Sequence, residues 1–171
     1  GITKLDLRGT RVEDLTPLAH MPLEELHVGG TLVHDLSALT GMPLAQLRLG
    51  GSPIADLTPL TGLQLAVLEV QHSKVTDLSP LAGMPLAELD ASFTQVADLS
   101  PLRGLKLSSL RVSSTMVSEL SALGRMPLAT LAIDGTKVAD LTPLKGMPLR
   151  LLAIARTQVV DLTPLRGMQL A

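Results

Sequence analysis

An acidic side chain recurs every 21 positions along this sequence, a pattern that could build a calcium ladder or paired catalytic carboxylates. Calcium, however, needs about six to eight oxygens around one ion. One acid per repeat, with neighbours roughly a strand separation of about 4.8 Å apart, does not converge in that way. The column consists of Asp14, Asp35, Asp56, Asp77, Asp98, Glu119, Asp140 and Asp161.

Ser or Thr follows each of these acids two residues later, and in most repeats Pro comes next, as in Asp77-Leu78-Ser79-Pro80. We interpret the Ser or Thr as a helix N-cap and the Pro as the first helical residue. The acid then accepts nearby backbone N–H bonds in an Asx-type turn. The column therefore predicts turn capping and no metal site.

The other side chains that could support chemistry are not arranged for it. His20, His27, His34 and His72 fall at four different places in the repeat, so no metal-binding set forms within one coil, and the absence of cysteine removes thiolate chemistry. Six methionines share one repeat position, which indicates core filling. No Gly-rich loop leads into a Lys-bearing helix. We expect neither an enzyme nor a cofactor.

Composition and charge narrow the classes of partner. The net charge of −2 argues against nucleic acid, which requires a basic patch, although residues 1–85 carry −4 and residues 86–171 carry +2. No apolar run approaches about 18 residues, so we expect no membrane insertion. The lack of cysteine and of a signal peptide favours a cytoplasmic location without establishing it.

The interval of 21 positions belongs to a repeat that fills the chain, and each repeat has to position these side chains. Its first position holds Ile2, Leu23, Leu44, Leu65, Leu86, Leu107, Leu128 and Leu149. Positions 4 and 6 are also apolar, and the alternation predicts a half-buried strand. Apolar residues at positions 11, 14, 17 and 20 point inward as well. A single coil cannot bury enough surface to fold alone, so the coils must stack.

Ser or Thr occupies position 9 of every repeat, as in Thr31, Ser52 and Thr94. A buried hydroxyl needs partners, and we predict that it bridges backbone groups of adjacent coils. An ice-binding array is the alternative, but such an array must face water.

The repeat resembles the short bacterial leucine-rich repeats, close to the internalin pattern in which a coil ends D-I-x-P-L. The matching stretches include residues 14–18, 77–81 and 161–165, and the likeness covers the whole chain. Two departures are a coil that is one residue shorter than the family's and the Ser or Thr where the family carries Asn. The resemblance implies an α/β-type solenoid: a right-handed coil with a parallel sheet on its concave face, short turn or 3₁₀ convex segments, and partner recognition on that sheet.

The surface of the expected sheet is where the coils differ most, at repeat positions 3, 5, 7 and 8. Residues exposed there are not dictated by packing, so they are the natural place for specificity, although neutral drift on a rigid fold would also produce variation. Phe93, the only aromatic residue, is either a binding anchor or a shield over an edge. His27 and His72 are binding residues or simply solvated. The predicted partner-binding set is Asp6, Arg8, Glu25, His27, Gln46, Arg48, Glu69, Gln71, His72, Glu88, Asp90, Phe93, Arg111, Asp134, Leu151 and Arg156.

We therefore expect residues 1–171 to form one leucine-rich-repeat domain that binds a protein or peptide, with no nucleic-acid partner. The alternative is a structural spacer or self-assembly element of a larger repeat protein. Solenoids need polar caps, whereas the end coils here offer Ile2, Leu5 and Leu7 at one end and Leu149, Leu152 and Ile154 at the other. Either the chain is a fragment without its caps or its ends associate.

Overall fold

The chain winds into eight coils that each contain one short strand and one 3₁₀ turn. The computed structural model describes residues 1–170. The strands are β1 (Lys4–Asp6), β2 (Glu25–His27), β3 (Gln46–Arg48), β4 (Val67–Glu69), β5 (Glu88–Asp90), β6 (Ser109–Arg111), β7 (Thr130–Ala132) and β8 (Leu151–Ala153). The 3₁₀ turns are η1 (Thr16–Leu18), η2 (Ser37–Leu39), η3 (Thr58–Leu60), η4 (Ser79–Leu81), η5 (Ser100–Leu102), η6 (Ser121–Leu123), η7 (Thr142–Leu144) and η8 (Thr163–Leu165).

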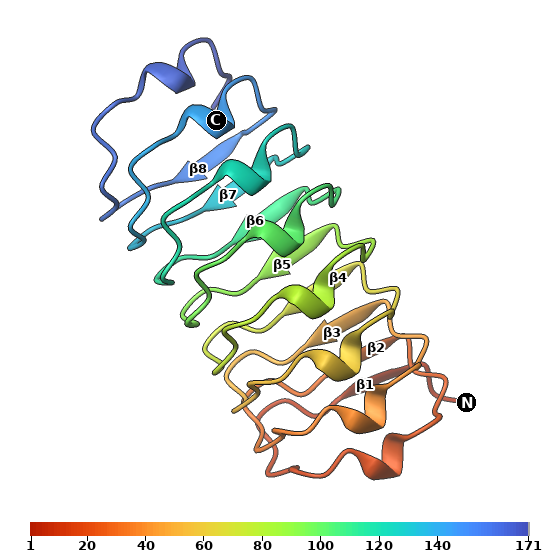
Figure 1. The fold of residues 1–171 in the computed structure, drawn as a ribbon. Helices are drawn as coiled ribbons and strands as arrows, with labels where there is room; N and C mark the ends of the chain where they lie inside the picture. The colour runs from red at the N-terminus through yellow and green to blue at the C-terminus, as the bar shows by residue number, and fades with distance from the viewer. Residues whose placement is uncertain (171) are drawn as a thin grey trace.

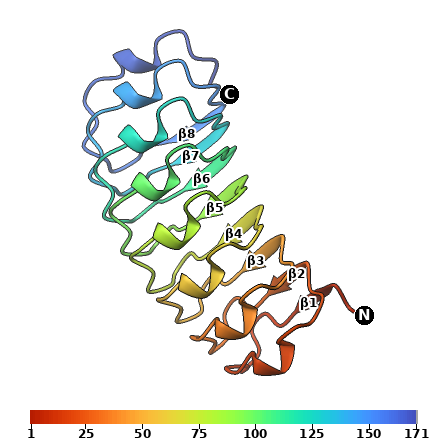
Figure 2. The ribbon, with the colours of Figure 1, turned by 45° about the vertical axis from the view of Figure 1, so that its right-hand side comes forward.

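All eight strands pair in parallel and in the order of the sequence. Each residue lies opposite its counterpart in the next coil, so that Leu26 is between Leu5 and Leu47. Figures 1 and 2 show the strands along one side of the stack and the 3₁₀ turns along the other. The predicted solenoid with a parallel sheet and 3₁₀ segments is confirmed. None of the helical turns within residues 1–170 has the length and apolar character needed to span a bilayer.

Leucine fills the interior because each coil contributes the same inward positions to a continuous core. In the fourth coil, Leu65, Leu68 and Leu81 are fully buried, and Met84 is 4% exposed. Aromatic side chains are not needed, because adjacent coils bring identical aliphatic side chains into contact. The methionine column is core, as predicted.

Two positions in each coil adopt positive φ, one after the strand and one after the 3₁₀ turn. Glycine holds most of these places, since only glycine takes this conformation without strain. After the strand, however, repeat position 8 holds His72, Phe93, Ser114 and Arg156 in four coils, with φ between 54° and 57°. Repeat positions 7 and 8 therefore lie beyond the end of each short strand, not on it as expected.

The acidic column caps the 3₁₀ turns. Asp77 accepts the backbone N–H of Ser79 at 2.8 Å and also the Ser79 hydroxyl. The same N–H bond forms in six other coils, from Thr16, Ser37, Thr58, Ser100, Thr142 and Thr163. Hydrogen bonds from the hydroxyl and the backbone N–H of the same Ser or Thr hold the pKa of each Asp below its ordinary value of 3.8.

The assignment of Ser or Thr as the N-cap was wrong by one residue. The cap is the preceding leucine, such as Leu57, which has no side-chain capping bond. The shift arises because a 3₁₀ turn closes with a three-residue hydrogen bond, here from Leu60 N–H to Leu57 O at 2.9 Å. The hydroxyl residue is thus the first residue inside the turn.

Most of the buried hydroxyls at repeat position 9 form a hydrogen bond within their own coil. Thr94 Oγ1 donates to Ala91 O at 2.7 Å, and the equivalent threonines make the same bond three residues back. The prediction that the hydroxyls bridge adjacent coils is wrong for Thr94, Thr115 and Thr136, whose hydroxyls donate to the carbonyl three residues back in their own coil. It is confirmed at Thr31, whose hydroxyl also lies 3.2 Å from Ser52 Oγ of the next coil. Ser52 is different: its Oγ donates to Val28 O of the previous coil at 2.7 Å.

The apolar side chains of the two end coils are less buried than those of the interior coils, as expected, except for Leu149. Ile2 is 53% exposed, and Leu5, Leu7, Leu152 and Ile154 are partly buried. Leu149 was expected to be exposed but is only 2% exposed. Residues 166–169 of the last coil line a hollow together with Leu149.

Candidate functional site

The predicted partner-binding residues gather on one surface, which we call the sheet face. Each strand places its middle leucine inward, so the two flanking residues point outward, as Glu25 and His27 do around Leu26. Ten members lie on strands: Asp6, Glu25, His27, Gln46, Arg48, Glu69, Glu88, Asp90, Arg111 and Leu151. The other six follow the strand ends: Arg8, Gln71, His72, Phe93, Asp134 and Arg156.

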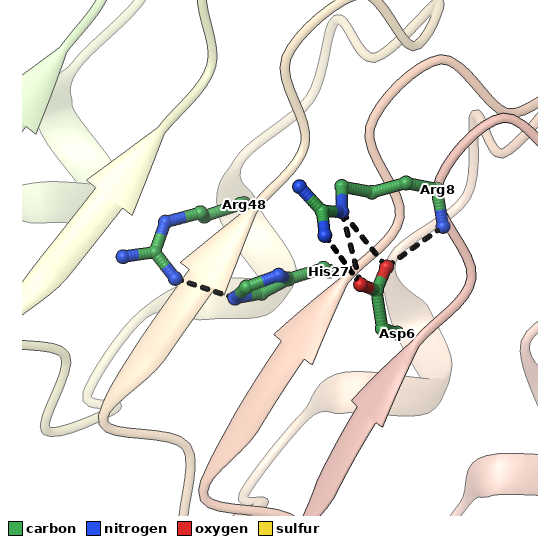
Figure 3. Close-up of polar contacts among 4 residues, drawn as sticks. All are labelled: Asp6, Arg8, His27 and Arg48. Carbon is green, nitrogen blue, oxygen red and sulfur yellow. Dashed lines mark hydrogen bonds and ion pairs between the residues drawn. The ribbon is translucent and has the colours of Figure 1, made fainter.

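Ion pairs order the first two strands of the sheet face. Lys4 Nζ lies 2.7 Å from Glu25 Oε1, which raises the pKa of Lys4 and lowers that of Glu25. The Arg8 guanidinium binds both oxygens of Asp6, and this pairing, with the Arg8 backbone N–H, lowers the pKa of Asp6 to about 2 (Figure 3). Both Asp6 and Arg8 are largely exposed, so the pair fixes side-chain direction more than it stabilises the fold.

Arg48 joins the second, third and fourth strands. Its Nε donates to Glu69 Oε1 at 2.8 Å, and its Nη1 donates to His27 Nε2 (Figure 3). Arginine remains protonated in proteins, so His27 Nε2 must accept and Nδ1 must carry the ring proton. That Nδ1 is buried with no hydrogen-bond partner among the described residues. His27 is therefore neither a free solvated side chain nor a fully satisfied one.

Gln71 lies flat across the neighbouring coil because Gly50 leaves room for it. A Cβ added at Gly50 would lie 2.5 Å from Gln71 Nε2, so a side chain there would displace the amide. Gln71 Oε1 is buried and, within residues 1–170, accepts no hydrogen bond. His27 Nδ1, on the ring that Arg48 contacts, and Gln71 Oε1, two residues after Glu69, thus leave a donor and an acceptor unsatisfied.

Phe93 and His72 stack on each other at the far end of the strands. Their ring centroids are 4.3 Å apart and nearly parallel, at 8°. Both rings are presented by the positive-φ bend, and Phe93 remains 52% exposed. The ring therefore offers an apolar surface to solvent and also packs on a neighbouring coil, so the two expected roles of Phe93 are compatible.

The C-terminal part of the sheet face is smoother. Asp134 accepts the Ala155 backbone N–H at 2.9 Å and the Ser113 hydroxyl at 3.2 Å, which pins the bends of three coils together. Leu151 is 51% exposed opposite Thr130 of the adjacent strand, and the small side chains of Ala132 and Ala153 lie opposite each other at the strand ends. Charge thus gives way to apolar surface along the stack.

The geometry suits noncovalent contact. Among residues 1–170, no three His, Asp or Glu side chains come close enough to hold a metal ion. Two residues that contact the predicted set were missed from the sequence: Lys4, which pairs with Glu25, and Ser113, which bonds Asp134. Oppositely charged residues one repeat apart, such as Lys4 and Glu25, were a usable signal, because that spacing places them on adjacent strands.

Comparison with known proteins shows which solved structures share this architecture. No protein-family model matches the chain, and no curated protein matches it by sequence. Among solved structures, internalin C2 of Listeria monocytogenes is 32% identical, with a TM-score of 0.83 over 95% of this chain and 71% of that one. Internalin InlF of the same organism is 25% identical, with a TM-score of 0.63 over 97% of this chain and 64% of that one.

InlJ of Listeria monocytogenes is 22% identical, with a TM-score of 0.70 over 98% of this chain and 38% of that one. This similarity shows the shared fold only. Internalin C2 is similar to this chain in sequence as well as in structure, because the match combines 32% identity with coverage of most of both chains. Leucine-rich repeats of this type are protein-interaction modules in general. The parallel strand register, the 3₁₀ turns and this similarity together show that the chain belongs to the internalin-type leucine-rich-repeat proteins.

Proposed function

We propose that the chain binds a protein or peptide partner through the sheet face. The observation that carries the proposal is the pair of unsatisfied buried atoms, His27 Nδ1 and Gln71 Oε1, beside the Arg48–Glu69 ion pair. Buried polar atoms nearly always have a partner in folded proteins. A polypeptide backbone offers both a carbonyl to accept from His27 and an N–H to donate to Gln71 once small side-chain movements open the site.

The rest of the face complements such a contact. The exposed Phe93 ring beside this polar region has the character of an interface anchor, since aromatic residues dominate binding energy at patch centres. The Arg48–Glu69 pair is only about a third exposed on each side chain, and a partner that covers it would strengthen the attraction between them. The face thus combines an apolar anchor, oriented charge and open hydrogen-bonding capacity.

The test is affinity capture on the immobilised chain with two matched variants. The sheet-face variant replaces Arg48, Glu69, Asp90 and Phe93 by alanine. The control variant replaces an equal set of one cation, two acids and one exposed apolar residue on other surfaces: Lys137, Glu13, Glu119 and Met116, all exposed. Both should retain the circular dichroism spectrum of the native chain.

Proteins retained by the native chain and by the control, but lost from the sheet-face variant, are the expected result. Each is then purified and titrated against all three forms. Equal retention by the two variants would remove the sheet face from the proposal, because the same number and kind of charges change in both.

End-to-end self-association is the second candidate. Leu162, which occupies an inward repeat position, is 58% exposed in the last coil, and Ile2 is 53% exposed in the first. Apolar surface of this kind favours contact with another surface. Light scattering should show mass rising with concentration, and Leu162→Lys should reduce the rise; a constant mass in both forms would exclude this candidate.

A further inference from the structure

A basic strip runs along a different surface, the edge formed by the loops between each 3₁₀ turn and the next strand. In the last four coils these loops are residues 103–108, 124–129, 145–150 and 166–170, and they contain no Asp or Glu. We call their six cations, all exposed, the basic edge: Arg103, Lys106, Arg125, Lys145, Arg150 and Arg166. The corresponding loops of the first four coils contain no Lys or Arg and one acid, Glu24.

The fold stacks the loops that carry these cations. The start of each strand bonds to the loop of the previous coil, as in Ala129 N–H to Ser108 O at 2.8 Å and Arg150 N–H to Ala129 O at 2.9 Å. The loops therefore stack in register, one coil apart. Six of the nine cations in residues 86–171 fall on this edge, so the charge difference between the two halves of the chain is concentrated in one place.

The cations on this edge are not neutralised by neighbouring acids. None of the ion pairs formed within residues 1–170 includes any of the six. Arg103 stands closest to acidic surface, since it shares a hollow with Asp98 and Glu119 on the side of the 3₁₀ turns. The remaining five face loops that carry no acid.

Shallow hollows separate successive loops, and the basic edge flanks two of them. One is lined by Arg125 and Lys145 with Met126 and Met147 at its floor. The next is lined by Arg150 and Arg166. The equivalent hollow between the first two coils has the same Met and Pro lining, with Met21 and Met42, but no Lys or Arg. Of these three hollows, only the two in the C-terminal coils are flanked by cations.

We propose that the basic edge binds an extended acidic peptide segment of a partner protein, a second interaction separate from that of the sheet face. In an extended chain, side chains on one side recur about every 6–7 Å. Carboxylates on that side meet the row of cations, and the small side chains between them point away from the edge. Charge complementarity of this kind sets specificity and association rate.

Two other classes of anionic partner fit less well. The methionines at the floor of the hollows are only 4% and 6% exposed at Met126 and Met147, so they cannot enter a bilayer. The sole aromatic residue, Phe93, lies on the sheet face, so the basic edge has no ring on which nucleic-acid bases could stack. An acidic peptide needs neither feature.

The experiment measures fluorescence anisotropy of a labelled 12-residue peptide of alternating Glu and Ala, with a Gln–Ala peptide as the uncharged comparison. The test variant is Lys145→Glu with Arg166→Glu, two positions that end 3₁₀ turns at ordinary negative φ. The matched control is Lys74→Glu with Lys137→Glu, an equal charge reversal at exposed positions on another edge. Circular dichroism verifies that both double variants are folded.

The Glu–Ala peptide should bind the native chain and the control, weaken as NaCl rises, and bind the test variant roughly tenfold less tightly or worse. Absence of binding, or equal loss in the two double variants, would overturn the proposal. So would tighter binding, through the same two residues, of a single-stranded oligonucleotide or of vesicles containing phosphatidylserine. Concentration-dependent association of the native chain that the test variant abolishes would instead assign the edge to contact between copies.

Discussion

Leu89→Ala tests the stacking that holds this solenoid together. Leu89 is 1% exposed in the middle of β5 and lies in register between Leu68 and Leu110, both fully buried. Removing three carbons loses about 2 kcal/mol of transfer free energy at roughly 0.8 kcal/mol per methylene. Neighbours on both sides prevent collapse, and the cavity raises the expected loss to about 3–4 kcal/mol.

Leu5→Ala is the matched change in β1. Leu5 is partly exposed and has a strand partner on one side only, Leu26. Less surface is lost and the cavity stays open to solvent, so we expect about 1–2 kcal/mol. Urea unfolding followed by circular dichroism measures both, with Leu110→Ala as the interior control expected to match Leu89→Ala. Equal losses at residues 5 and 89 would refute the argument that burial comes from coils on both sides.

Three further predictions concern the turns. Asp77→Ala should lower the urea midpoint more than Asp77→Asn, since an amide oxygen still accepts the Ser79 N–H; equal midpoints would contradict the capping role. The capping aspartates have lower pKa values in the folded chain than in the unfolded chain, so they stabilise the fold fully above pH about 4. This stabilisation is lost as the pH falls further, and the urea midpoint should therefore decline between pH 6 and 2. At the positive-φ bend, Gly51→Val should destabilise the folded chain by about 1–2 kcal/mol, whereas Ser114→Gly should be neutral or stabilising. Thermal unfolding measures both changes, and the reverse order would be incompatible with a left-handed bend.

The sequence predicts the sheet well because the register has only one solution. Identical leucines at a constant interval can align only with their counterparts in the next coil, which fixes the pairing of Leu26 with Leu5 and Leu47. The Asp bonds were predictable too, since donor and acceptor are two residues apart. In both cases local spacing determines the contact.

Contacts that depend on competition between acceptors were harder to predict. Thr94 could bond across coils or to its own coil, and only the backbone path shows that Ala91 O is nearer. The bend that presents His72 and Phe93 did carry a signal: glycine holds the same position in Gly9, Gly30, Gly51 and Gly135, all at positive φ. Reading that column as a left-handed position would have placed both rings beyond the strand ends.

The sheet face and the basic edge should respond differently to salt, because their charges are arranged differently. On the sheet face, Lys4, Arg8 and Arg48 each have a carboxylate partner, so a binding protein meets local dipoles and little net charge. On the basic edge the cations have no such partners within residues 1–170, so their field extends into solvent until ions screen it, over about 8–10 Å at physiological salt. A partner of the sheet face should therefore survive a salt wash that releases an acidic segment from the edge.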